Sequence, residues 1–152
     1  MEQTYAIELK NITKRFGKIV ANDGINLKVK RGEILSLLGE NGSGKTTLMN
    51  MISGIYFPDE GHILVGGKAV SIRSPKDSFD LGIGMIHQHF KLIDVMTAAE
   101  NIILGLKGNA VLDMKKVHKD IQELVDRYGF DLDPAQKVYT MSVSQKQTVE
   151  IV

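Results

Sequence analysis

Short stretches that alternate apolar and polar residues dominate the first part of the chain. Residues 6–9 and 25–29 alternate in this way, which is typical of strands with one buried face. Residues 62–65 and 68–70 flank Gly66 and Gly67, and this arrangement predicts a β-hairpin. The pattern therefore predicts an antiparallel β region in the N-terminal part of the chain.

Two further runs are mostly apolar and do not alternate. Residues 33–38 and 83–87 are short runs of this kind, which predicts two buried strands. Residues 47–53 can continue as a helix until Gly54 ends it. Pro75 can open a short helix that runs to about Leu81. A buried strand followed by a helix is the βα unit of an α/β protein.

The later part of the chain has helical spacing. Thr97 and Glu100 form a predicted capping box at the start of one helix. Asp113 can cap a second helix, and Gly129 is its predicted end. The apolar residues of that helix fall on one face, at Val117, Ile121, Leu124, Val125 and Tyr128.

The composition is that of a soluble globular domain. The chain has 152 residues, of which 43% are hydrophobic and 24% are charged. Its net charge of +1 gives no basic excess that would indicate nucleic-acid binding. It contains no cysteine, which excludes disulfides, thiol nucleophiles and cysteine metal sites. No apolar run approaches the roughly 20 residues that span a bilayer.

Residues 39–46 carry the clearest chemistry. They fit the pattern G-x-x-x-x-G-K-[ST], which is the phosphate-binding loop of nucleotide-binding proteins. The alternative is a flexible Gly-Ser turn, but the apolar run before the loop and the helix after it favour an anion site at a helix N-terminus. Lys45 would reach the β- and γ-phosphates of ATP, and the Thr46 hydroxyl would bind Mg²⁺. The residues of this stretch that are predicted to contact nucleotide are Gly39, Asn41, Gly42, Ser43, Gly44, Lys45, Thr46 and Thr47.

Around this loop the sequence resembles the ATP-binding cassette family, the ATPase subunits of ABC transporters. Residues 11–17 resemble the segment that places an aromatic ring on adenine, and Phe16 would be that ring. The alternative for Phe16 is packing in the core. The resemblance implies an α/β fold with a P-loop NTPase core, an antiparallel β subdomain and a helical subdomain. The predicted regions are 1–95 for the β subdomain and P-loop core, and 96–152 for the helical subdomain.

Gln88 resembles the glutamine of the family's Q-loop, which can contact Mg²⁺ or the attacking water. With Lys45 it completes the predicted catalytic pair. An ordinary surface glutamine at a strand end is the alternative. His87 and His89 flank it, but no third ligand is near them in the sequence, so a metal pair is not expected.

Residues 141–147 resemble the family signature, usually written L-S-G-G-Q. Ser142 would cap a helix and contact the γ-phosphate bound by the other subunit of a head-to-tail dimer. Val143 and Ser144 replace the two glycines, and Ser144 can approach a phosphate only with a negative φ. The alternative is an ordinary helix with a serine cap.

Residues 18–23, 82–90 and 100–105 resemble the import ATPases for nucleosides or simple sugars. The resemblance implies ATP and Mg²⁺ as cofactors. It also implies transmembrane permease subunits, a second cassette and, indirectly, an extracytoplasmic binding protein as partners, with no nucleic acid. The subunit would be cytoplasmic and peripheral, on the inner face of the membrane.

The chain ends at Val152, and no run of four apolar residues followed by Asp-Glu occurs in it. The family supplies its Mg²⁺-binding aspartate and its general base on such a run. We therefore expect the N-terminal part of a cassette domain, with the second half of the domain absent. Such a chain is expected to bind ATP weakly and to hydrolyse it at background level. Two alternatives are a non-catalytic nucleotide-binding or interaction module, and another P-loop enzyme such as a small kinase.

Overall fold

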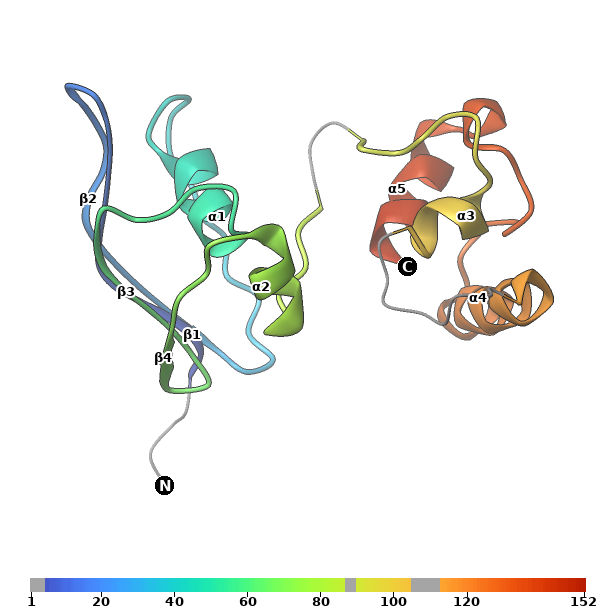
Figure 1. The fold of residues 1–152 in the computed structure, drawn as a ribbon, viewed down its shortest axis with the longest axis horizontal. Coiled ribbons are helices and arrows are strands. Elements are labelled where there is room, and N and C mark those ends of the chain that lie inside the picture. The colour runs from blue at the N-terminus through green and yellow to red at the C-terminus, as the bar shows by residue number, and fades with distance from the viewer. Residues whose placement is uncertain (1–4, 87–89, 105–112) are drawn as a thin grey trace. The chain divides into compact units, whose positions relative to one another are not determined.

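The computed structural model describes residues 5–86, 90–104 and 113–152 (Figure 1). The chain divides into two compact units, Met1–Met85 and Ile86–Val152. This division lies before the boundary predicted after residue 95. Residues 91–94 bond within the second unit, where Ile93 N donates to Asn101 Oδ1 and Tyr139 N donates to the carbonyl of Asp94.

A four-stranded sheet in the order β2-β1-β3-β4 forms the body of the first unit, and every neighbouring pair is antiparallel. β1 spans Tyr5–Phe16 and β2 spans Ile19–Lys30, joined by the turn at Gly17 and Lys18. β3 (Glu60–Val65) and β4 (Lys68–Val70) form the predicted hairpin around Gly66 and Gly67. Alternation thus identified β1 and β2, which extend beyond the predicted stretches, and the hairpin pattern identified β3 and β4.

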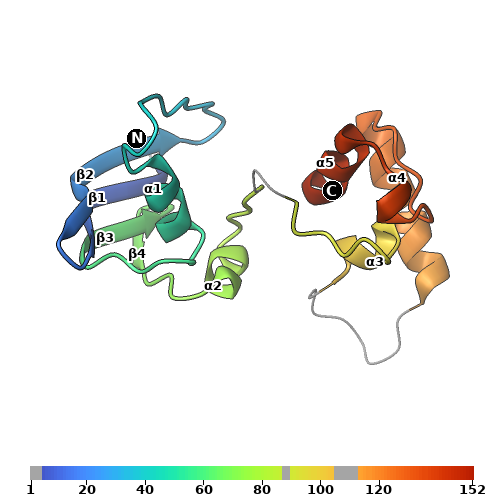
Figure 2. The ribbon, with the colours of Figure 1, turned by 90° about the horizontal axis from the view of Figure 1, so that it is seen from above.

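Two helices accompany this sheet. α1 (Lys45–Ile52) packs Leu48 and Met51 against Leu9, Ile12 and Ile63 of the sheet, which gives the first unit its core. Figure 2 shows α1 beside the sheet, with α2 (Pro75–Asp80) following it. Pro75 stands at the start of α2 as predicted, and the Ser74 side chain accepts a hydrogen bond from Asp77 N.

The two buried strands predicted at residues 33–38 and 83–87 are wrong for the residues that the structure describes. Residues 33–38 and 83–86 belong to no strand, and Ile34 and Leu38 are 96% and 89% exposed. A run of apolar residues becomes a strand only when a neighbouring strand pairs with its backbone groups. Within the described part of the chain neither run has such a neighbour. His87 lies outside the described residues.

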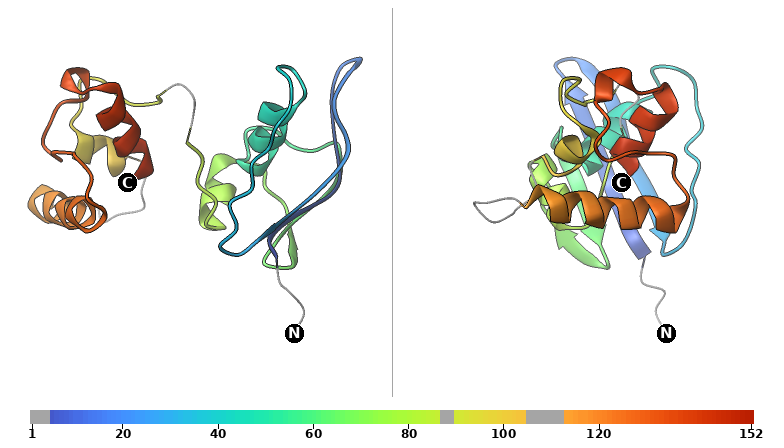
Figure 3. Two further views of the ribbon diagram at one scale, coloured as in Figure 1. Left: turned by 180° about the vertical axis from the view of Figure 1, so that it is seen from behind. Right: turned by 90° about the vertical axis from the view of Figure 1, so that its right-hand side faces the viewer.

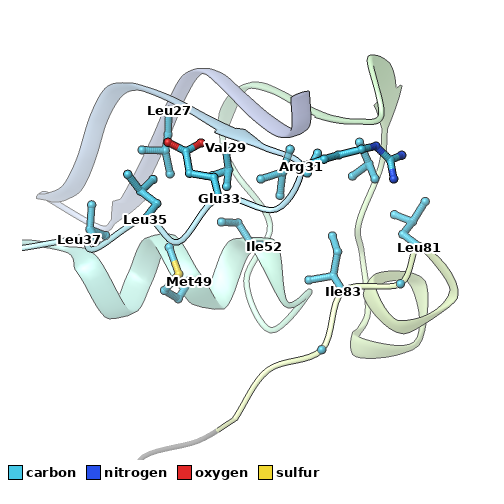
Figure 4. Close-up of a pocket in the computed structure, with 15 residues that line it drawn as sticks. Leu27, Val29, Arg31, Glu33, Leu35, Leu37, Met49, Ile52, Leu81 and Ile83 are labelled. Atoms are coloured by element: carbon cyan, nitrogen blue, oxygen red, sulfur yellow. The ribbon is translucent and has the colours of Figure 1, made fainter. Parts of the chain in front are cut away.

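Leu35, Leu37 and Ile83 instead line an open cavity of about 760 Å³ (Figure 4). Its other apolar lining residues include Met49 and Ile52 of α1 and Leu27 of β2, and the close-up shows the side chains of Leu35, Leu37 and Ile83 directed toward it. Part of each predicted buried strand therefore borders a space inside the first unit.

Helices make up the second unit, as the spacing predicted; Figure 3 gives two more views. They are α3 (Ala98–Ile102), α4 (Met114–Tyr128), the short 3₁₀ helix η1 (Val138–Thr140) and α5 (Val143–Ile151). The Asp113 side chain caps α4, and Gly129 ends it with a φ of 67°. Ile121 and Val125 are buried as predicted, whereas Leu124 and Tyr128 are exposed.

The capping box of α3 offers a direct stability measurement. Thr97 Oγ1 accepts from Glu100 N, and Glu100 Oε2 accepts from Thr97 N at 2.6 Å. We expect Thr97→Ala to lower the free energy of unfolding of this unit by about 1 kcal/mol, because the amide of Glu100 loses its acceptor. Urea denaturation followed by helical circular dichroism measures the change.

Thr148→Ala is the matched control for this capping prediction. The Thr148 hydroxyl donates to the carbonyl of Ser144 inside α5, so it caps no helix end. We expect its effect to stay within about 0.5 kcal/mol. Equal losses for the two variants would contradict the role of the Thr97 cap.

Candidate nucleotide-binding site

The glycine-rich loop at residues 39–44 leads directly into α1. Gly42 and Gly44 both have a φ of 84°, in the left-handed region that favours glycine. Gly44 is the N-cap of α1, and no side chain caps this helix end. The backbone N–H groups of its first turn are therefore available to an anion, which the helix dipole also attracts.

Strand β2 holds the end of this loop. The side chain of Asn22 is buried and donates to the carbonyl of Gly44 at 3.3 Å. A Cβ atom at Gly44 would lie 2.3 Å from the carbonyl oxygen of Ala21, so only glycine fits without a shift of the backbone. Sequence reasoning missed Asn22, because a lone asparagine inside a strand gives no signal of a contact with a distant loop.

Lys45 places its ammonium group inside the loop. Lys45 Nζ donates to the carbonyl oxygens of Gly39 and Glu40, both at 2.7 Å, and to Ser43 Oγ at 3.1 Å. The loop therefore gathers a positive charge and an uncapped helix N-terminus in one place. Both features attract phosphate, and this combination defines the class of P-loop nucleotide-binding proteins.

The residues around Lys45 fit a metal held through phosphate. The Thr46 hydroxyl is exposed in the first turn of α1, next to Lys45. In the ranges 5–86, 90–104 and 113–152, no group of three His, Asp or Glu side chains could hold an ion by itself. Mg²⁺ commonly binds through one or two protein oxygens together with substrate phosphates. Thr46 suits that mode of binding.

Phe16 lies at the end of β1 and is 41% exposed. The alternative that it packs in the core is therefore wrong. Its ring contacts Tyr56 in a T-shaped arrangement with centroids 5.2 Å apart, and Lys14 Nζ lies 5.5 Å from the ring centroid. Nothing in the sequence indicated Tyr56 as a neighbour.

Two further predicted site residues are Gln88 and Ser142. Gln88, with His87 and His89, lies outside the described residues. Ser142 is in the second unit, where it forms the predicted cap of α5: its Oγ accepts from Gln145 N and its N–H donates to Gln145 Oε1. Ser144 lies in the first turn of α5 and has no positive φ.

A family profile described as ABC transporter matches residues 22–152. The chain therefore belongs to the ABC transporter family. It is 52% identical over 149 residues to the guanosine import ATP-binding protein NupO of Bacillus subtilis (strain 168), and this match covers 97% of the chain. It is 50% identical over 153 residues to the nucleoside import ATP-binding protein NupA of Lactococcus lactis subsp. cremoris (strain MG1363), with 99% of the chain covered.

Solved structures agree with this assignment. The crystal structure of an ATP-binding cassette of an ABC transporter in its ADP conformation matches with a TM-score of 0.82 and 26% identity, over 97% of this chain and 63% of that one. A dimeric cassette bound to ADP and Pi matches with a TM-score of 0.75 and 29% identity, over 95% of this chain and 67% of that one. The fold is therefore that of an ABC ATPase, with part of the P-loop core.

The chain spans 29% of the length of NupO and 30% of the length of NupA. Among the helices of the described residues, none combines the length and the apolar character needed to cross a bilayer.

Proposed function

We propose that this chain is the ATP-binding part of an ABC importer that takes up a nucleoside or a simple sugar. The observation that carries the proposal is the P-loop: an uncapped helix N-terminus at Gly44, with Lys45 Nζ inside the loop. The identity to NupO and NupA, whose names state guanosine and nucleoside import, supports the choice of transported molecule. A relative named for ribose, galactose and methyl galactoside import keeps simple sugars in the proposal.

Each residue of the site has a proposed role. The amides of residues 42–47 and Lys45 hold the β- and γ-phosphates, and Phe16 stacks on the adenine. Thr46 holds Mg²⁺ together with the phosphates, and the metal when bound offsets their negative charge. Gln88 contacts Mg²⁺ or the attacking water in the complete protein. Ser142 contacts the nucleotide of a second cassette in a head-to-tail dimer.

The complete protein would couple ATP hydrolysis to transport. Its proposed partners are transmembrane permease subunits, a second cassette and, indirectly, an extracytoplasmic binding protein, and its proposed place is the inner face of the membrane. For the 152-residue chain we propose nucleotide binding with hydrolysis at background level, because its sequence holds no apolar run ending in Asp-Glu.

Calorimetric titration of the 152-residue chain with a series of nucleotides tests the phosphate site. In the presence of Mg²⁺ we expect saturable binding of ATP and ADP, and no saturable binding of AMP or adenosine. The reason is that the helix N-terminus and Lys45 contact the outer phosphates. AMP binding as tightly as ATP would contradict the proposal, provided that circular dichroism shows a folded chain.

Uptake by cells tests the importer. Cells in which the gene carrying this sequence is disrupted are expected to lose uptake of a labelled nucleoside or of a labelled simple sugar. Unchanged uptake of both classes would contradict the transport part of the proposal while leaving the nucleotide site intact.

A further inference from the structure

The aromatic ring of Phe16 needs support from outside the hydrophobic core. Phe16 stands beside the turn of the β1–β2 hairpin, paired with Ile19, and both Ile19 and Val20 are exposed. An exposed ring with no packed neighbours would sample several rotamers. Its orientation is therefore set by the few groups that touch it.

Tyr56 is the first of these groups. Its ring packs against Phe16 at 5.2 Å with an interplanar angle of 72°, a favoured geometry for an aromatic pair. The backbone N–H groups of Ile55 and Tyr56 both donate to the carbonyl of Asn50, at 2.9 and 3.0 Å. Asn50 lies in α1, so Tyr56 is tied to the helix that begins at the phosphate loop.

Asp59 supplies the second support. Asp59 Oδ2 accepts from the backbone N–H of Arg15 at 2.6 Å, and Oδ1 accepts from Lys14 Nζ at 3.0 Å. The Asp59 N–H in turn donates to the carbonyl of Thr13 at 2.9 Å. The Arg15 N–H and then Lys14 hold the pKa of Asp59 below its ordinary value, so the carboxylate is charged at neutral pH.

Lys14 connects this ion pair to the ring. Its side chain is only 15% exposed, and its ammonium group lies 5.5 Å from the Phe16 centroid, within the range of a cation–π contact. Both supports of Phe16 therefore belong to the segment between α1 and β3, which Figure 1 shows crossing from the end of α1 to the start of β3.

We propose that Tyr56 is a positioning residue for the nucleobase: with the Lys14–Asp59 pair, it holds the Phe16 ring in the orientation that stacks on adenine. The proposal rests on the proposed function, in which Phe16 is the stacking ring. A ring that is already ordered loses less conformational entropy when the base binds. Because the support is anchored on α1, the same helix fixes the position of the phosphates and of the base.

Comparing ATP with inorganic tripolyphosphate separates the base from the phosphates. Tripolyphosphate can occupy the phosphate loop but has no base to stack. We expect Tyr56→Ala to weaken ATP binding about three- to tenfold, the cost of ordering one freed side chain, and to change tripolyphosphate binding by less than about twofold. Calorimetry with both ligands in the presence of Mg²⁺ measures the two affinities.

Three further variants sharpen the test. Tyr56→Phe keeps the ring and is expected to bind ATP like the unchanged chain. Asp59→Asn removes the negative charge that pairs with Lys14. It is expected to lower the affinity for ATP but not for tripolyphosphate, and by less than Tyr56→Ala does. Tyr139→Ala removes an exposed tyrosine of the second unit and is expected to leave both affinities unchanged.

Equal weakening of ATP and tripolyphosphate by Tyr56→Ala would overturn the inference, because it would show general damage to the loop. Unchanged ATP affinity in Tyr56→Ala would also overturn it. If the unchanged chain bound ATP no more tightly than tripolyphosphate, the phosphate site would stand and the inference would fail. If the folded chain bound neither ligand, the proposed function itself would fail, and the inference with it.

Discussion

Lys45→Ala is expected to weaken Mg-ATP binding by this chain about 100-fold or more, equivalent to about 2.7 kcal/mol. The Lys45 ammonium is held in the loop by the carbonyls of Gly39 and Glu40 and by Ser43 Oγ. When nucleotide binds, the ammonium group can exchange these neutral acceptors for phosphate oxygens. Because the side chain is already ordered, this exchange loses little conformational entropy. Hydrogen bonds between charged groups are about twice as strong as neutral ones, so the loss is large.

Calorimetry on the folded variant measures this effect, with Lys119→Ala as the matched control. Lys119 carries the same charge on the exposed face of α4, where it lies 3.8 Å from Glu123, and its removal leaves the net charge equal to that of the Lys45 variant. We expect the control to bind Mg-ATP normally. A Lys45→Ala chain that keeps its affinity would show that the loop does not hold phosphate through this side chain.

Residues 33–38 are expected to make the 152-residue chain associate with itself at high micromolar concentration. Ile34 and Leu38 are almost fully exposed, and the backbone of this run pairs with no strand in the described part of the chain. A second copy of the chain can pack on exposed apolar side chains that lie next to unpaired backbone groups. Such a contact both buries apolar surface and satisfies backbone hydrogen bonds.

The double variant Ile34→Lys with Leu38→Lys is expected to weaken this association at least tenfold. Two large apolar side chains that leave water each contribute about 1.5–3 kcal/mol, and the added like charges repel each other. Light scattering across a concentration series measures the mass. Val95→Lys, on the exposed surface of the second unit, is the control and should still associate. A monomer at every concentration for the unchanged chain would contradict the prediction.

Local patterns predicted much of the fold correctly. The turn at Gly66 and Gly67, the cap at Thr97 and the C-terminal stop at Gly129 depend on residues close in sequence, and all of them are present. The phosphate loop was recognisable for the same reason, since its glycines, Lys45 and the following helix are contiguous. These features need no distant partner to form, so the linear pattern is sufficient.

Contacts between distant residues could not be predicted from the same patterns. Asn22 reaches the carbonyl of Gly44 from β2, and Tyr56 reaches Phe16 from beyond α1. The two residues of each pair are far apart in the sequence. The path of the chain between them decides whether they meet. The sequence predicted the loop and the Phe16 ring, together with Gln88 and Ser142. The structure adds contacts to the loop and the ring from β1, β2 and the segment between α1 and β3.

The sequence by itself determined which segments can be strands or helices, where α3 and α4 begin, and which loop is the candidate phosphate site. Only the tertiary structure decided which apolar runs become strands. Residues 62–65 pair with β1 and form β3, whereas residues 33–38 and 83–86 have no paired neighbour and remain outside the sheet. The physical reason is that a helix satisfies its backbone hydrogen bonds within its own segment, while a strand satisfies them only through another strand.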